Sequence, residues 1–187
     1  MSGIALVLLK KGLSVSGSDI AKNDRLTEIA KNGGIIFHSQ TPQNIDIIRE
    51  RFSMKNIIVV ISSAINDKNK ELNYCIKSQL TIKHRSEILS LIMKSYQSIA
   101  VAGSHGKTTT STLLTTLLDL CTKDTSSIVG GIIPRYESNT IIKKSKYLIA
   151  EIDESDGTTC KYTPYLGIIN NIDFDHCDYY SNIEELI

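Results

Sequence analysis

The stretch "VAGSHGKTTTST" at residues 101–112 decides how the second half of this chain folds. It follows the apolar run 98–102 and leads into a leucine-rich segment. This order predicts a buried strand, a glycine-containing turn and a helix over about 107–121. Backbone N–H groups at a helix N-terminus bind anions, and glycine lets a phosphate approach them closely. We therefore predict a phosphate-binding loop.

The loop is a shortened form of a known pattern. Four residues usually separate its two glycines, whereas two separate them here, which gives G-x-x-G-K-T. In such a loop Lys107 follows the β- and γ-phosphates of a nucleotide, and the Thr108 hydroxyl binds Mg²⁺. A glycine turn that only caps a helix is the alternative interpretation. The candidate nucleotide contacts are Gly103, Ser104, His105, Gly106, Lys107, Thr108 and Thr109.

Acidic residues follow two further apolar runs, 147–152 and 166–172, which we predict to be strands. Ligands bind at the carboxyl ends of parallel strands, and Mg²⁺ prefers carboxylate oxygens. Glu151 is the strongest candidate because it still lies within the strand pattern. For the other acids of the first cluster, taken singly, a solvated turn is the alternative, and His176 of the second cluster has a structural role as its alternative. The two clusters are Glu151, Asp153, Glu154 and Asp156, and then Asn170, Asn171, Asp173, Asp175 and His176.

The first half of the chain alternates short β-type runs with helical runs. Five consecutive β-branched residues at 57–61 suit a strand that is buried on both faces. The pattern predicts an α/β fold class: a Rossmann-like parallel-sheet domain at 1–96, followed by part of a P-loop ATPase α/β domain at 97–187. The other expected strands are 13–15, 35–37 and 81–83, and the expected helices are 2–11, 24–32, 44–52, 69–79 and 86–94.

Composition argues against several classes of partner. With 21 basic and 20 acidic residues the formal charge is +1, which supports neither a nucleic-acid nor a membrane partner. The four cysteines form no Cys-x-x-Cys pair, so we expect reduced thiols rather than a zinc or redox site. The first apolar run has its lysines after it, the reverse of a secretory signal. We expect a cytoplasmic protein, and the sequence leaves its oligomeric state open.

Six segments, taken in order, resemble the Mur ligase family. His105 in the loop and the "DESD" segment at 153–156 narrow the resemblance to the member that joins L-alanine to UDP-N-acetylmuramate. The segments are "MSGIA" (1–5), "SGSD" (16–19), "VVISSAI" (59–65), "VAGSHGKTTT" (101–110), "AEIDESD" (150–156) and "NNIDFDHCDYY" (170–180).

The resemblance implies an ATP-dependent ligase of peptidoglycan synthesis. The muramate carboxylate would be phosphorylated to an acyl phosphate, and the amine of L-alanine would displace the phosphate. By position, Lys107 corresponds to the phosphate-binding lysine and Thr108 to a Mg²⁺ ligand. Glu151 corresponds to the carboxylate that bridges the metals, and His176 to a ligand of the second metal. The implied cofactors are ATP and Mg²⁺, and the implied substrates are UDP-N-acetylmuramate and L-alanine.

The resemblance also makes the first domain the UDP-sugar-binding domain. Its candidate contacts are Ser18, Asp19, His38, Ser62 and Ser63, for which a polar residue at a strand end is the alternative interpretation. Family members carry a glycine-rich strand and turn before "MSGIA" and a further C-terminal domain. In this chain Gly157-Thr158-Thr159 also stands in place of the usual Ser-Phe. We therefore expect a fragment truncated at both ends.

Three alternative functions stay open. A murein peptide ligase of the same family is disfavoured because Ser155 stands where that enzyme carries a bulky residue. An unrelated P-loop kinase is disfavoured by the shortened loop and by the βα unit ahead of it. A non-catalytic, nucleotide-binding remnant is favoured by the truncation.

Overall fold

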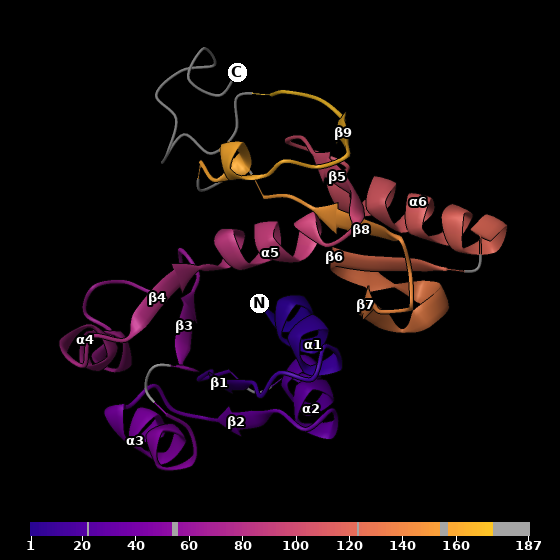
Figure 1. Ribbon diagram of the computed structural model, residues 1–187. Coiled ribbons are helices and arrows are strands. Elements are labelled where there is room, and N and C mark those ends of the chain that lie inside the picture. Colours follow the sequence, from indigo (N-terminus) through magenta and orange to yellow (C-terminus); the bar gives the residue numbers. More distant parts are fainter. Residues whose placement is uncertain (22, 54–55, 123, 154–156, 174–187) are drawn as a thin grey trace. The chain divides into compact units, whose positions relative to one another are not determined.

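A computed structural model describes the chain except residues 22, 54–55, 123, 154–156 and 174–187. Its elements mix helices with mainly parallel strands, which confirms the predicted α/β class (Figure 1). The chain divides into two compact units, Met1–Ile88 and Leu89–Ile187. This division falls within helix α5 (Arg85–Lys94), whereas the sequence places the domain boundary at residue 96. The assignment of roles to the two domains stays a prediction.

Side-chain caps start two helices of the first unit. Asn23 and Asn69 precede α2 and α4, and the side-chain oxygen of each accepts the N–H three residues on. Pro42 occupies the first turn of α3, where no helical N–H bond is lost. The elements are α1 (Ser2–Lys10), β1 (Ser16–Ser18), α2 (Asp24–Lys31), β2 (Ile35–Phe37), α3 (Pro42–Arg51), β3 (Ile58–Ile61), α4 (Lys70–Lys77), β4 (Thr81–His84) and α5.

The described strands of the first unit form two separate parallel pairs, β1–β2 and β3–β4. Two predictions are wrong here. The strand expected at 13–15 begins instead at Ser16, because pairing with β2 outweighs the weak strand propensity of Ser-Gly-Ser. The strand expected to be buried on both faces, 57–61, is β3, and its Ile58 is 57% exposed. A strand in a two-stranded sheet has fewer neighbours to cover it.

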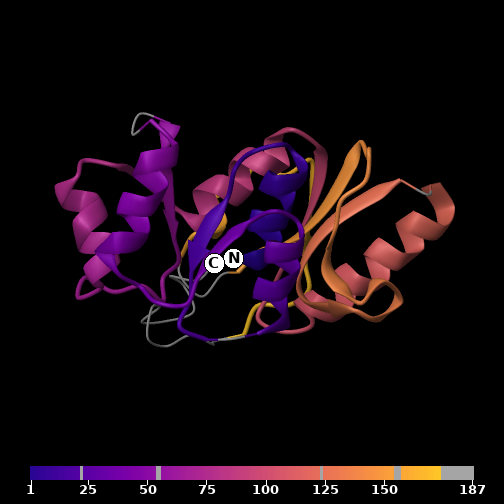
Figure 2. The ribbon, with the colours of Figure 1, turned by 90° about the horizontal axis from the view of Figure 1, so that it is seen from below.

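The second unit contains a five-stranded sheet of order β7-β6-β8-β5-β9. Neighbouring strands are parallel except β7, which pairs antiparallel with β6 at one edge. Helix α6 (Lys107–Thr122) packs along β6, β8 and β5, as Figures 1 and 2 show from two directions. The strands are β5 (Gln97–Ala102), β6 (Thr125–Ile133), β7 (Ser138–Ile141), β8 (Tyr147–Glu151) and β9 (Leu166–Ile169).

The strands β5, β8 and β9 and the helix α6 confirm the sequence prediction, but β6 and β7 were not predicted. Strand β6 reads Thr-Ser-Ser-Ile-Val-Gly-Gly-Ile-Ile, a composition poor in the alternation that marks strands. Its first three residues, 125–127, are nevertheless at most 1% exposed. Short hydroxyl side chains pack into this sheet because the long apolar residues of β8 and β5 fill the space beside them.

An apolar layer between α6 and the sheet positions the loop that joins β5 to α6. Ile99, Val101 and Ile149 form a buried cluster, and Leu114 and Leu118 of α6 pack against it. These two leucines are four residues apart and therefore share one face of the helix. Burying each such side chain contributes about 1.5–3 kcal/mol. Among the described helices, α6 included, none is long and apolar enough to cross a membrane.

A buried carboxylate stabilises the far end of α6. Asp119 is 8% exposed and accepts hydrogen bonds from Lys143 Nζ and the Tyr136 hydroxyl. The Lys143 ammonium, and after it the Tyr136 hydroxyl, hold the pKa of Asp119 below its usual value. A lowered pKa contributes stability above the ordinary value of about 3.9, and this contribution is lost as the pH falls through the lowered pKa.

Asp119→Asn is therefore expected to lower the free energy of unfolding at pH 7 by about 1–3 kcal/mol, because two donors lose a charged acceptor. Urea unfolding at pH 7 and at acidic pH measures this, with exposed Glu50→Gln as the charge-loss control. The difference from the wild type should shrink as the pH falls below the ordinary value for an aspartate. Equal unfolding free energies at pH 7 would contradict the assignment.

Candidate nucleotide and metal site

The loop between β5 and α6 depends on its two glycines for its shape. Gly103 and Gly106 have φ of +126° and +78°, in the region that side chains rarely adopt. A Cβ on Gly103 would also lie 3.0 Å from the carbonyl oxygen of Asn171. The G-x-x-G spacing therefore builds a turn that packs tightly against the segment after β9, in addition to any access it gives a ligand.

That segment, 170–173, holds the loop through hydrogen bonds. The Asn171 side-chain oxygen accepts the His105 N–H at 2.9 Å, and the Asn171 carbonyl accepts the Ser104 N–H at 3.3 Å. Ser104 Oγ in turn accepts the Asp173 N–H at 3.0 Å. The sequence placed these strand-end residues near a metal but did not foresee that they hold the loop.

These contacts narrow the set of N–H groups that can face a phosphate. The amides of Ser104 and His105 donate to Asn171. Helix α6 makes its first backbone bond from Thr110 N–H to Gly106 O, so the N–H groups of Thr108 and Thr109 belong to the first turn, which has no acceptor one turn earlier. The first turn of α6 is thus the part of the predicted loop best placed to bind an anion.

Lys107 lies over the loop rather than extending into solvent. Its Nζ donates to the carbonyl oxygens of Gly103 at 2.5 Å and Ser104 at 3.2 Å. The ammonium therefore lies beside the same turn whose helix end carries the positive dipole. Both features favour negative charge at this point.

Glu151 lies beside Thr108. Strand β8 runs parallel to β5 with Glu151 paired to Val101, so the carboxylate lies at the carboxyl end of its strand, next to the loop. Thr108 Oγ1 donates to Glu151 Oε1 at 3.0 Å and lies 3.2 Å from Oε2. The Gly130 N–H donates to Oε2 at 2.7 Å. The expectation that β8 delivers an acid to the loop is confirmed, and the role of that acid stays a prediction.

The donor set at this point suits a hard cation. A hydroxyl and a carboxylate are oxygen ligands of the kind that Mg²⁺ takes, and Mg²⁺ usually draws its other ligands from phosphates and water. Within the described ranges no group of three or more His, Cys, Asp or Glu could hold a metal by itself. The residues present therefore fit a cation that arrives with a nucleotide. Three predicted or alternative acids and ligands, Glu154, Asp156 and His176, lie outside the described residues.

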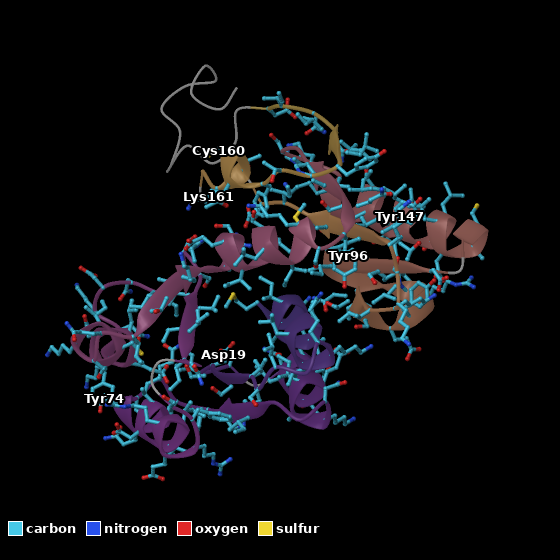
Figure 3. All side chains as sticks on the ribbon, viewed as in Figure 1. Asp19, Tyr74, Tyr96, Tyr147, Cys160 and Lys161 are labelled. Atoms are coloured by element: carbon cyan, nitrogen blue, oxygen red, sulfur yellow. The ribbon has the colours of Figure 1, made fainter. Side chains whose placement is uncertain are left out.

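In the first unit the predicted UDP-sugar contacts follow strand ends. Asp19, labelled in Figure 3, comes directly after β1, and its N–H donates to the carbonyl of Phe37, the residue before His38. Asp19 and His38 therefore leave neighbouring strands at the same edge. The Ser18 hydroxyl donates to the carboxylate of Glu71 on α4, a partner that the sequence did not indicate.

The second strand pair brings Ser63 to a histidine that the sequence analysis missed. Ser62 and Ser63 follow β3, and His84 ends the neighbouring β4. The Ser86 N–H lies 3.3 Å from His84 Nδ1, which places the ring proton on Nε2, 3.2 Å from Ser63 Oγ. In this tautomer His84 donates to Ser63 and cannot activate it as a nucleophile. The pair suits a polar contact to a ligand better than catalysis.

Two family profiles match the chain along nearly its whole length. The profile described as "Mur ligase family, catalytic domain" matches residues 1–97, and "Mur ligase middle domain" matches residues 101–187. The boundary between the two matches lies close to the one expected from the sequence. The second match contains the loop, Thr108 and Glu151.

Curated relatives agree with the profiles. A UDP-N-acetylmuramate:L-alanine ligase from Prochlorococcus marinus subsp. pastoris is 59% identical over all 187 residues, which cover 40% of that protein. A ligase of the same name from a Synechococcus species is 44% identical with the same coverage. The chain thus spans about 40% of the length of these relatives.

Solved structures show the same fold. The UDP-N-acetylmuramate:alanine ligase from Thermotoga maritima matches with a TM-score of 0.85 at 25% identity, over 100% of this chain and 42% of that one. A UDP-N-acetylmuramate:L-alanyl-γ-D-glutamyl-meso-diaminopimelate ligase from Neisseria meningitidis matches with a TM-score of 0.87 at 21% identity, over 100% of this chain and 61% of that one. The profiles, the relatives and the fold agree that the chain belongs to the Mur ligase family.

Proposed function

We propose that this chain is the part of a UDP-N-acetylmuramate:L-alanine ligase that binds the UDP-sugar with its first unit and Mg–ATP with its second, in the cytoplasm. One observation carries the proposal: the Glu151 carboxylate accepts the Thr108 hydroxyl at the start of the helix that follows a G-x-x-G-K-T loop. The names of relatives up to 59% identical support the choice of substrates.

The reaction requires charge to be stabilised on a transferring phosphoryl group. A muramate carboxylate oxygen attacks the γ-phosphorus of ATP, ADP leaves, and the amine of L-alanine then displaces phosphate from the acyl phosphate to form the amide. The Lys107 ammonium and the first-turn amides of α6 bind the terminal phosphates and offset their charge. Thr108 and Glu151 would hold a Mg²⁺ ion, which would neutralise phosphate charge as it develops. By resemblance, His176 would hold a second cation.

The rival functions are separated by specific features. For the murein peptide ligase, the similar solved structures share the fold, while the relatives of higher identity carry the L-alanine ligase name. A remnant that only binds nucleotide would retain the Thr108–Glu151 pair without supporting ligation. A test therefore has to measure ligation within a longer chain.

The test is a chimera in which these 187 residues replace the matching segment of the Prochlorococcus relative. We expect ATP- and L-alanine-dependent consumption of UDP-N-acetylmuramate, with release of ADP and phosphate in equal amounts. The tripeptide substrate of the murein peptide ligase should not be consumed. A folded chimera that binds nucleotide without ligation would support the remnant, and preference for the tripeptide would support the sibling enzyme.

A further inference from the structure

Two adjacent glycines on β6, Gly130 and Gly131, lie against the proposed cation ligands. The registered pairs between β6 and β8 end at Ile128 and Ala150, one residue before Glu151. Beyond that point the Gly130 N–H donates to the Glu151 side chain. The pairing of β6 with β7 also shifts register between Ile128 and Ile133, the stretch that contains both glycines.

Lack of space, not backbone conformation, explains glycine at both positions. Neither residue has a positive φ, so an alanine would fit the backbone. A Cβ on Gly130 would lie 3.0 Å from both carboxylate oxygens of Glu151, and a Cβ on Gly131 would lie 2.8 Å from Thr108 Cγ2. Each substitution would thus displace one of the two side chains that carry the proposed ligand atoms.

The two displacements differ in kind. The Glu151 carboxylate is the end of a flexible side chain and would swing away from a methyl group at little cost in stability. Thr108 is β-branched, so moving its methyl group requires χ1 rotation, which moves the hydroxyl as well. Both changes would separate the hydroxyl and carboxylate oxygens, which are now 3.0 Å apart.

We propose that Gly130 and Gly131 are positioning residues that set the Glu151 carboxylate and the Thr108 hydroxyl to face one Mg²⁺ ion. Gly130 acts by donating its N–H to the carboxylate, and Gly131 acts by leaving room for the Thr108 methyl group. The inference rests on the proposed function, which assigns that ion to a nucleotide. Groups that orient metal ligands typically change metal affinity by about 10–100-fold when they are altered.

The test uses this chain and a methylanthraniloyl-labelled ATP, titrated with Mg²⁺ and again with EDTA. Gly131→Ala and Gly130→Ala should each weaken Mg²⁺-dependent binding by about 10–100-fold and leave binding in EDTA unchanged. Gly167→Ala on β9, where a Cβ would meet no atom within 4 Å, is the matched control and should bind as the wild type does.

A double-mutant cycle distinguishes positioning from general damage. Thr108→Ser removes the methyl group that Gly131→Ala would strike and keeps the hydroxyl. In that background Gly131→Ala should change affinity by no more than about twofold relative to Thr108→Ser alone. Equal losses from Gly131→Ala in both backgrounds, or none in the wild type, would overturn the inference about Gly131. Unchanged Mg²⁺ affinity in Gly130→Ala, whose clash involves only the flexible carboxylate, would overturn that about Gly130. A wild-type chain that binds no nucleotide even with Mg²⁺ would instead refute the proposed function.

Discussion

Replacing Lys107 with alanine is expected to abolish the binding of Mg–ATP by this chain. The Lys107 ammonium lies over the loop, on the carbonyl oxygens of Gly103 and Ser104, beside the first turn of α6. It is the group placed to offset the charge of the β- and γ-phosphates. A hydrogen bond to a charged group contributes about 1.5–3 kcal/mol, so its loss from an already weak site brings affinity below detection.

Isothermal titration with Mg–ATP measures this effect. Lys94→Ala, at the exposed end of α5, is the control for loss of one lysine from the same unit and should bind as the wild type does. Lys107→Arg should recover little affinity, because a planar guanidinium does not replace a compact ammonium in a tight loop. Equal affinity in the wild type and Lys107→Ala would refute the loop as the nucleotide site.

The second large effect is expected from Glu151→Gln. Glutamine keeps the length of the side chain and an oxygen for the Gly130 N–H, so the local packing should survive. It removes the negative charge that a Mg²⁺ ligand supplies. We expect the Mg²⁺-dependent part of nucleotide affinity to fall by about 10–100-fold, while the part measured in EDTA stays the same.

A neighbouring acid provides the comparison for this variant. Asp153 is two residues beyond Glu151, after the end of β8, and the sequence favours Glu151 over it. Asp153→Asn should therefore keep the Mg²⁺ dependence of the wild type in the same titration. Loss of Mg²⁺ dependence in Asp153→Asn, together with its retention in Glu151→Gln, would move the cation to the later acid.

The sequence predicted the parts of the fold that local patterns specify. Strand β5, the loop and α6 are consecutive, and each has a strong pattern of its own: an apolar run, two glycines, and a helical leucine face. Strands β1 and β6 have no such pattern, because Ser-Gly-Ser and Thr-Ser-Ser become strands only through their neighbours. Their formation depends on tertiary pairing, which outweighs intrinsic propensity.

The same distinction applies to the candidate site. The proximity of Thr108 and Glu151 follows from the rule that parallel strands deliver polar residues to one edge, so it was predictable. The contacts of Asn171 with His105, of His84 with Ser63 and of Gly130 with Glu151 were not. They join residues 66, 21 and 21 positions apart, and no local sequence signal specifies such pairs.

A crystal structure of this chain with Mg²⁺ and a non-hydrolysable ATP analogue tests the central claim most directly. We expect the terminal phosphates at the first turn of α6, within reach of Lys107 Nζ. One cation should lie about 2.0–2.1 Å from Thr108 Oγ1 and from a Glu151 carboxylate oxygen. Terminal phosphates bound away from this loop, or a phosphate-bound cation with Glu151 outside its ligand shell, would contradict the account.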